Sequence, residues 1–284
     1  LDVGGVFTDG TESRGIDVSE LGTVDIVNDS VVTMGAGAHA VNIETVGDVA
    51  MQSRRIATYG NEAYGLSVLT GGDVTLDIDE ITTYGNLATA LFVGNDTGDI
   101  NARLGNVHTF ATEGDWFAVG LSSNSGDVNL QVDDGVRAES GYAITTASFE
   151  GGVHIGVAEG ATVFGQAVAI DSATATGTRI DIAGTVQSVG GPAIQVAGND
   201  IGAGAADIRI GATGTVLGAL QLSGGNDVVT NAGEFQTRGA SQFGAGTDRF
   251  ANFGLVSLSE RDSGIVLQGL EQFDNAGTVS LVNG

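Results

Sequence analysis

Cysteine and lysine are absent from the 284 residues, and proline occurs once. Without cysteine the chain has no disulfide framework, no cysteine-ligated zinc and no thiol nucleophile. Without lysine it has neither a P-loop nor a Schiff-base nucleophile. These absences exclude several large classes of enzyme before any motif is considered.

Positive charge is also scarce, because 10 basic residues, all Arg, face 35 acidic ones and the formal net charge is −25. A nucleic-acid ligand needs a basic face, so we expect no nucleic acid as a partner. Anionic lipid is disfavoured for the same reason. No apolar run is long enough to form a membrane-spanning helix, so we expect no direct membrane insertion. The sequence begins at Leu1 without a signal peptide and stops at Gly284 inside a motif, so we expect a segment of a longer chain.

Glycine is abundant, with 47 residues, and it marks a repeat. Turn glycines recur at a nearly constant spacing, and each turn is followed by three short segments in which apolar residues alternate with polar ones. The turn glycines are Gly22, Gly47, Gly72, Gly98, Gly126, Gly152 and Gly177. Period-two alternation indicates strands, and three per repeat indicate a three-sided coil. One coil cannot bury its own apolar face, so successive coils must stack as parallel strands about 4.8 Å apart.

The predicted fold class is therefore an all-β parallel β-solenoid with three strands per coil. The alternative, a β-sandwich, gives no reason for identical side chains at a constant spacing. Coils of roughly 25–29 residues fill positions 1–205, and shorter coils rich in Asn and Gly, of roughly 21–23 residues, fill positions 206–284. No linker separates the two regions, so we expect one continuous domain over 1–284. We expect four positions to be buried in its core: Ile56, Leu66, Val74 and Leu76.

Several segments resemble a known family. They are Ile-Thr-Thr-Tyr-Gly-Asn-Leu-Ala at 81–88, Gly-Gly-Asn-Asp at 224–227, Phe-Gly-Ala-Gly-Thr-Asp-Arg-Phe-Ala-Asn at 243–252 and Asn-Ala-Gly-Thr-Val-Ser-Leu at 275–281. They look like the coils of passenger domains of type V autotransporters of Gram-negative bacteria. The resemblance implies a right-handed parallel β-helix, an extracellular location on the bacterial cell surface and a C-terminal β-barrel translocator in the full-length chain.

Metal sites have weak candidates only. A column of four carboxylates spaced by about one coil, which could share Ca²⁺ or cap the turns, consists of Asp48, Asp73, Asp99 and Asp127. The glycine-rich segments at 224–227 and 244–248 each end in Asp, but they lie one short coil apart, unlike the nonapeptide repeats that share Ca²⁺ between consecutive turns. We expect no cofactor, with Ca²⁺ as the one ion to test.

Charged residues of the first segment alternate in sign from coil to coil, as with Arg54 between Asp29 and Asp79. Polysaccharide lyases and hydrolases on β-helices need an unpaired base or two carboxylates at a set separation, so we interpret this face as ion pairs that fix the register. The three His residues fall in different columns, which predicts solvated side chains. We therefore expect a protein that is not an enzyme.

Aromatic residues on the outward positions are the remaining feature. One column, with a spacing of one coil between successive members, comprises Met34, Tyr59, Tyr84 and Phe110, and beside it lie Tyr64, Phe92, Trp116 and Phe117. Exposed apolar patches mark contact surfaces, although the rings could merely cover one another. We expect an adhesin, self-association or stalk module whose partner is a neutral glycan or another passenger copy. The alternatives are a polysaccharide-degrading lyase or hydrolase and a glycan binder like a phage tailspike.

Overall fold

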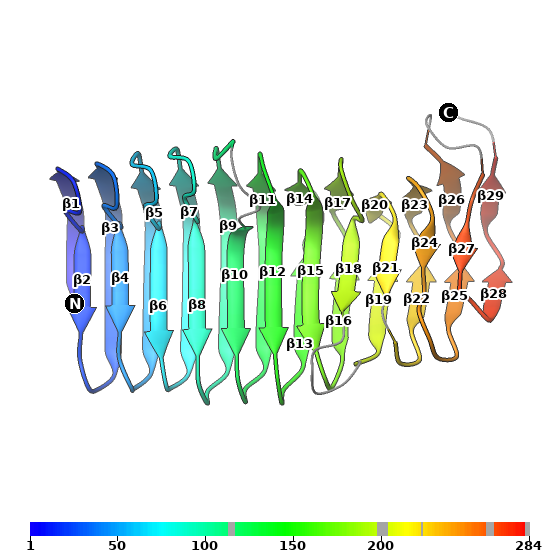
Figure 1. The fold of residues 1–284 in the computed structure, drawn as a ribbon, viewed down its shortest axis with the longest axis horizontal. Helices are drawn as coiled ribbons and strands as arrows, with labels where there is room; N and C mark the ends of the chain where they lie inside the picture. Colours follow the sequence, from blue (N-terminus) through cyan, green and yellow to red (C-terminus); the bar gives the residue numbers. More distant parts are fainter. Residues whose placement is uncertain (113–116, 198–203, 223, 260–263, 282–284) are drawn as a thin grey trace.

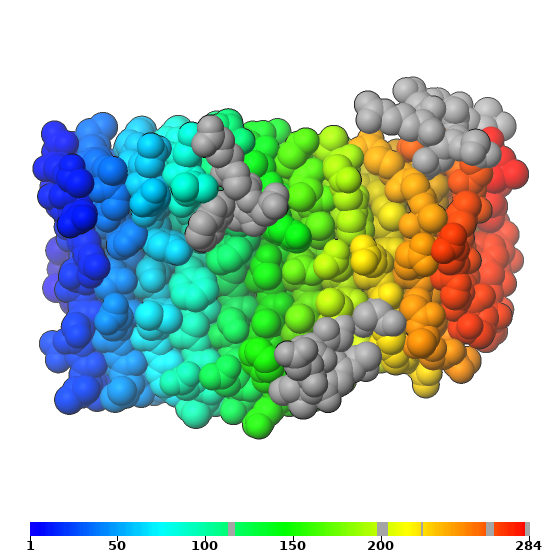
Figure 2. All heavy atoms as spheres, viewed as in Figure 1, coloured from blue at the N-terminus to red at the C-terminus, as the bar shows by residue number. Residues whose placement is uncertain are grey.

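The computed structural model describes residues 1–112, 117–197, 204–222, 224–259 and 264–281. Over these residues the chain forms strands and turns and no α-helix, so it contains no helix that could cross a membrane. The strands build coils that follow one another along a single long axis from the N-terminus to the C-terminus (Figure 1). In the space-filling view the colours run in sequence order along that axis, so each coil has only its neighbours beside it (Figure 2). The predicted β-solenoid is confirmed.

Two parallel sheets run the length of the described structure, and all their strand pairs join neighbouring coils. The second sheet has eleven strands in sequence order, one from each coil up to the one before β28. They are β2 (Ile16–Ser19), β4 (Val41–Glu44), β6 (Leu66–Thr70), β8 (Leu91–Asn95), β10 (Phe117–Ser123), β12 (Tyr142–Ser148), β15 (Val168–Thr174), β18 (Ile194–Ala197), β21 (Leu220–Leu222), β24 (Ser241–Gln242) and β27 (Leu267–Gln268).

The first sheet changes character near its middle. In the early coils the first two predicted segments continue as one long strand. These strands are β1 (Asp2–Asp9), β3 (Val24–Met34), β5 (Val49–Thr58), β7 (Val74–Thr83), β9 (Ile100–Thr109) and β11 (Val128–Ala138). Inward-facing residues alternate along each, but the alternation skips one residue near the middle, for example between Asn28 and Val31. The skip marks a bend in the strand, at the place where the sequence predicted a corner between the first and second segments of the coil.

From Val153 onward the same two segments are separate strands. The pairs are β13 (Val153–Val157) with β14 (Thr162–Gly165), β16 (Thr178–Ile182) with β17 (Thr185–Ser188), β19 (Ala206–Ile210) with β20 (Thr215–Leu217), β22 (Val228–Asn231) with β23 (Glu234–Thr237), β25 (Arg249–Asn252) with β26 (Leu255–Leu258), and β28 (Gln272–Asn275) with β29 (Thr278–Ser280). The long β11 pairs with both β13 and β14. A wider turn at residues 158–161, with Gly160 at φ 83°, replaces the bend and breaks the strand.

The register follows the repeat in the sequence. Val24 pairs with Val49, Val49 with Val74, and Val74 with Ile100. The four positions predicted to be buried, Ile56, Leu66, Val74 and Leu76, are at most 1% exposed. The core is thus a stack of apolar columns, in which each side chain packs on its equivalent one coil away.

The glycines at the corner after the long strands have a clear physical role. Gly35 adopts φ 132°, a left-handed conformation that side chains disfavour. Any Cβ on Gly60 or Gly85 would collide with the carbonyl group of the corresponding glycine in the preceding coil. This close approach lets the corners of successive coils stack at the strand spacing.

Candidate functional site

Three of the predicted aromatic residues form a stack on the outside of the solenoid. Tyr59, Tyr84 and Phe110 directly follow the ends of β5, β7 and β9, and each is about two-fifths exposed. The ring centroids of Tyr59 and Tyr84 are 4.5 Å apart and those of Tyr84 and Phe110 are 4.9 Å apart, with planes parallel within 6°. Met34 occupies the same column and is 38% exposed. The predicted outward column of large apolar side chains is confirmed.

The stacking decides which part of each ring a ligand can reach. Each face of Tyr84 is covered by a neighbouring ring, and the ring centroids of Phe110 and His108 are 3.7 Å apart. Burial and the adjacent Tyr59 hydroxyl raise the pKa of Tyr84. The stack therefore offers ring edges and hydroxyl groups to solvent, while its faces stabilise the stack itself.

A second set of rings lies across the same corner, at the start of the second sheet. The ring centroids of Tyr64 and Phe92 are 6.3 Å apart, as are those of Phe92 and Phe117, and the planes are tilted by 46° and 35°. All three rings are half-buried. Tilted rings leave part of each face open, unlike the parallel stack. The eighth predicted residue, Trp116, lies outside the described residues.

A groove of about 400 Å³ opens beside the second set of rings. Phe92 and Leu69 form its apolar wall, and the missing side chain of Gly94 makes room between them, since a Cβ there would lie 2.9 Å from Leu69 Cδ2. Asn95 and Asp96 are on its rim. Apolar walls with a polar rim are the usual composition of a small-ligand groove. Phe92 was predicted from the sequence, but the groove was not, because its depth depends on a glycine that no spacing distinguishes.

The predicted carboxylate column links the coils through hydrogen bonds to main-chain amides. The carboxylate of each Asp accepts the N–H of the equivalent residue in the next coil, at 2.7 to 3.0 Å. Its members are Asp48, Asp73, Asp99 and Asp127. The prediction gave each Asp the amides of its own turn, and the structure corrects this to the next turn. In the part of the chain that the structure describes, no group of three or more His, Asp or Glu side chains is arranged to hold a metal ion.

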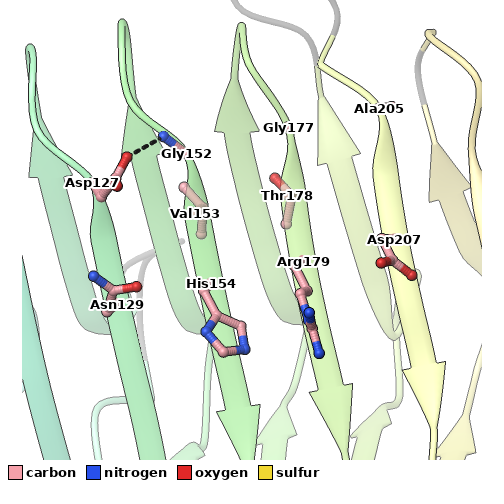
Figure 3. Close-up of a pocket in the computed structure, with 10 residues that line it drawn as sticks. All are labelled: Asp127, Asn129, Gly152, Val153, His154, Gly177, Thr178, Arg179, Ala205 and Asp207. Carbon is pink, nitrogen blue, oxygen red and sulfur yellow. Dashed lines mark hydrogen bonds between the residues drawn. The ribbon is translucent and has the colours of Figure 1, made fainter.

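The outer face of the first sheet carries the charged residues, and Figure 3 shows part of it, a shallow cleft of about 300 Å³. Arg179 lines it and binds Asp181, with Nε 2.7 Å from Oδ2 and Nη2 3.2 Å from Oδ1. His154, on the neighbouring strand, donates from Nε2 to Oδ2 of the same carboxylate at 2.9 Å. Burial opposes the ionisation of Asp181, but the bonds from Arg179 and His154 outweigh it, so the pKa of this carboxyl is lowered.

These ion pairs correct one detail of the sequence interpretation. Arg179 pairs in register with Asp207 of the next coil, yet it binds Asp181 of its own strand, and Arg209 likewise binds Asp207 at 2.6 Å. Residues i and i+2 of a strand point to the same side, so the planar guanidinium reaches both carboxylate oxygens without bridging coils. The predicted contact between Arg54 and Asp29 across coils is confirmed at 2.6 Å.

The histidines are not simply solvated, as the sequence suggested. His39 Nδ1 accepts the N–H of Tyr64 at 2.9 Å, and burial lowers the pKa of His39. His108 Nε2 lies 3.0 Å from Glu139 Oε1 while its ring packs on Phe110. Both histidines contact the aromatic corner, a role that depends on side-chain contacts between coils.

The two glycine-rich segments near the C-terminus place Asp227 and Asp248 in the core. Both are at most 1% exposed, and Asp227 follows Ala206 in the column that holds Val or Ile in the early coils. Asp227 Oδ1 accepts the N–H of Ala206 at 2.7 Å, and the N–H of Asp227 donates to Asp248 Oδ1 at 2.8 Å. Burial, with a contribution from Asp248, raises the pKa of Asp227 to about 6. The inward direction was not evident in the sequence, where these segments were considered only as a weak Ca²⁺ candidate.

Comparison of the chain with protein-family models, with curated proteins and with solved structures gave no match in any of the three searches. The chemistry of the surface therefore carries the functional argument.

Proposed function

We propose that this chain is part of an autotransporter passenger displayed on the surface of a Gram-negative bacterium, where it acts as an adhesive module on a rigid stalk. A solenoid without helices over all the described residues and a chain without cysteine are compatible with this role. The resemblance of the coil motifs supports the secretion route. The stacking of coils makes a stiff rod, since each coil is bonded to the next along both sheets.

The observation that carries the adhesive role is the aromatic corner, in which two rows of rings face solvent on either side of one turn. The rows are Tyr59, Tyr84 and Phe110, and Tyr64, Phe92 and Phe117. A row of this length outside a solenoid has no core to fill, so it fits a contact surface. The tilted row presents ring faces on which the C–H side of a sugar can pack, and the stacked row presents hydroxyl groups that can bond its hydroxyls.

The charge of the surroundings selects the partner. Glu80 lies beside the stacked row, Asp96 lies on the rim of the groove at Phe92, and the whole chain carries a net charge of −25. Anionic polysaccharides would be repelled by such a surface. The partner we propose is a neutral glycan, and a second passenger copy is the competing outcome of the test.

The test compares variants of cells that display the module. Tyr59→Ser with Tyr84→Ser alters the stacked row, and Tyr64→Ser with Phe92→Ser alters the tilted row. Phe253→Ser is the matched control, because it removes a 59% exposed ring from the C-terminal coils. We expect the tilted-row variant to reduce attachment to a neutral-glycan surface at least tenfold, the stacked-row variant to reduce it less, and the control to leave it unchanged.

Thermal unfolding of each purified variant separates loss of contact from loss of fold. Folded row variants that attach like the parent would overturn the adhesive assignment of this corner. Attachment that soluble neutral glycan fails to inhibit, but soluble module does inhibit, would show that the partner is another copy. Release of reducing ends from the glycan would instead favour the enzyme alternative.

A further inference from the structure

The corner that carries the aromatic rows contracts abruptly in the middle of the solenoid. Residues 84–90 connect β7 to β8, whereas residues 139–141 connect β11 to β12 and residues 166–167 connect β14 to β15. Longer turns in the early coils therefore project beyond the shorter ones that follow. The strands involved, β12, β15 and β18, lie side by side in the middle of the molecule (Figure 1).

An open groove of about 810 Å³ lies where the longer turns are followed by the shorter ones. Gly190 and Gly191 form part of its floor, where side chains are excluded because a Cβ would lie 3.0 Å from Gln166 O and 2.6 Å from Ala167 O respectively. The described residues that line the groove are all uncharged, although the chain contains 35 acidic residues. The cleft in Figure 3, by contrast, is lined by Asp, Arg and His. The described lining of the groove is thus uncharged on a strongly negative protein.

One aromatic ring and two amides face this groove. Tyr142 pairs in register with Phe117, so the groove begins where the tilted row ends. Gln166 is exposed on one side, and Gln195 is half-buried on the second sheet. A primary amide donates and accepts in one plane, which matches a pair of neighbouring sugar hydroxyls, and a tyrosine ring offers an apolar surface for the C–H side of the sugar.

A carboxyl group lies beside one of the two amides. Asp171 pairs with Gln195 in register on the second sheet. Burial raises the pKa of Asp171, and the Gln195 side chain opposes this effect.

The outward column continues beyond the groove as a row of amides. Gln195 pairs with Gln221, Gln221 with Gln242, and Gln242 with Gln268. Gln242 Nε2 donates to Gln268 Oε1 at 2.8 Å. The row repeats once per coil, at about 4.8 Å, and so presents amides at regular intervals along the solenoid axis.

We propose that the groove between the turns at residues 139–141 and 189–193 binds a neutral oligosaccharide, with Tyr142 as the platform and Gln166 and Gln195 as the hydroxyl-binding amides. The volume lies within the range of small-ligand sites, and the uncharged lining in an acidic protein selects an uncharged ligand. The proposal rests on the proposed function, because it names a second point of contact for the same class of partner.

The test is calorimetric titration of the chain with hexasaccharides of glucose, mannose and galactose, and with oligogalacturonate as the anionic probe. We expect binding of at least one neutral hexasaccharide and none of oligogalacturonate. Gln166→Glu and Gln195→Ala should each weaken binding about tenfold or more. Gln242→Ala, a matched change in the same column but outside the groove, should leave affinity within twofold.

Two results separate the groove from the aromatic rows. Affinity that is lost in Tyr64→Ser with Phe92→Ser but unchanged in Gln166→Glu and Gln195→Ala would overturn the groove and keep the proposed function. Absence of binding to all three neutral hexasaccharides by a folded chain would also overturn the groove, whether or not displayed cells attach. Normal attachment by the row variants, together with binding that depends on Gln166, would overturn the aromatic corner and keep the groove.

Discussion

Early and late coils of this solenoid differ in whether aromatic rings are part of the core. In the coils around Tyr59 and Tyr84 the rings lie outside and the core consists of aliphatic side chains. In the coils after Val228 the rings of Phe235, Phe243 and Phe250 are fully buried. The physical reason is coil length, because a shorter late coil has fewer inward positions than an early one and each must fill more volume. Aromatic residues in a solenoid therefore have to be interpreted together with coil length.

Buried polar residues form short contacts in the early coils and a longer ladder in the late ones. In the early coils Asn28 Nδ2 donates to Ser53 Oγ at 2.9 Å in the interior, and Thr70 and Asn95 bond the carbonyl groups of the preceding coil at the corners. In the late coils Asn231 Nδ2 donates to Asn252 Oδ1 at 2.8 Å, and Asn252 Nδ2 donates to Asn275 Oδ1 at 2.7 Å. This Asn ladder joins three successive coils by side-chain hydrogen bonds.

The largest expected effect comes from a charge in the early core. Leu66→Asp places a carboxylate at a fully buried position without a partner, which we expect to destabilise the fold by more than about 4 kcal/mol. Leu69→Asp is the control, since Leu69 lies in the same strand, β6, but is 44% exposed. Chemical denaturation of both measures the difference. Equal stability of the two variants would contradict the register.

Two Phe→Ala substitutions, one in the late core and one on the outside of an early coil, compare the two uses of aromatic rings directly. Phe250→Ala empties a buried position in the late coils and should lower the free energy of unfolding by about 3–5 kcal/mol. Phe110→Ala removes a ring from the outside of an early coil and should lower it by about 1 kcal/mol or less. Denaturant titration at one pH compares the two. A larger loss for Phe110→Ala would show that the outer stack, and not the core, holds the early coils.

The smallest effect depends on pH and concerns the late core only. Because the pKa of Asp227 is about 6 in the folded state and 3.8 ordinarily, the folded state holds a proton that the unfolded state releases between these values. Stability should therefore fall as pH rises from about 4 to 6, by up to about 3 kcal/mol. Asp227→Asn should remove this loss and make the protein more stable at pH 7. Denaturation curves at pH 4 and pH 7 measure it, with Asp99→Asn, a surface change, as the control. Equal pH dependence in the parent and Asp227→Asn would exclude Asp227 as its source.

The sequence by itself determined the stacking. In a parallel in-register solenoid, equal spacing along the chain becomes direct contact in space, so the spacing predicted the buried columns and the outward aromatic column. It also predicted the carboxylate column, although not that each Asp would bond the next coil.

Only the tertiary structure decided which partners individual side chains bond, which ring faces stay exposed and where grooves open. The sequence could not choose between Asp181 and Asp207 as the partner of Arg179, because both lie within reach and side-chain geometry makes the choice. It did not show that Tyr84 would lose both ring faces to its neighbours, nor that Asp227 would point inward. The groove at Tyr142 arises from the difference in length between consecutive turns, a property of several coils together, and the spacing of identical residues carries no record of it.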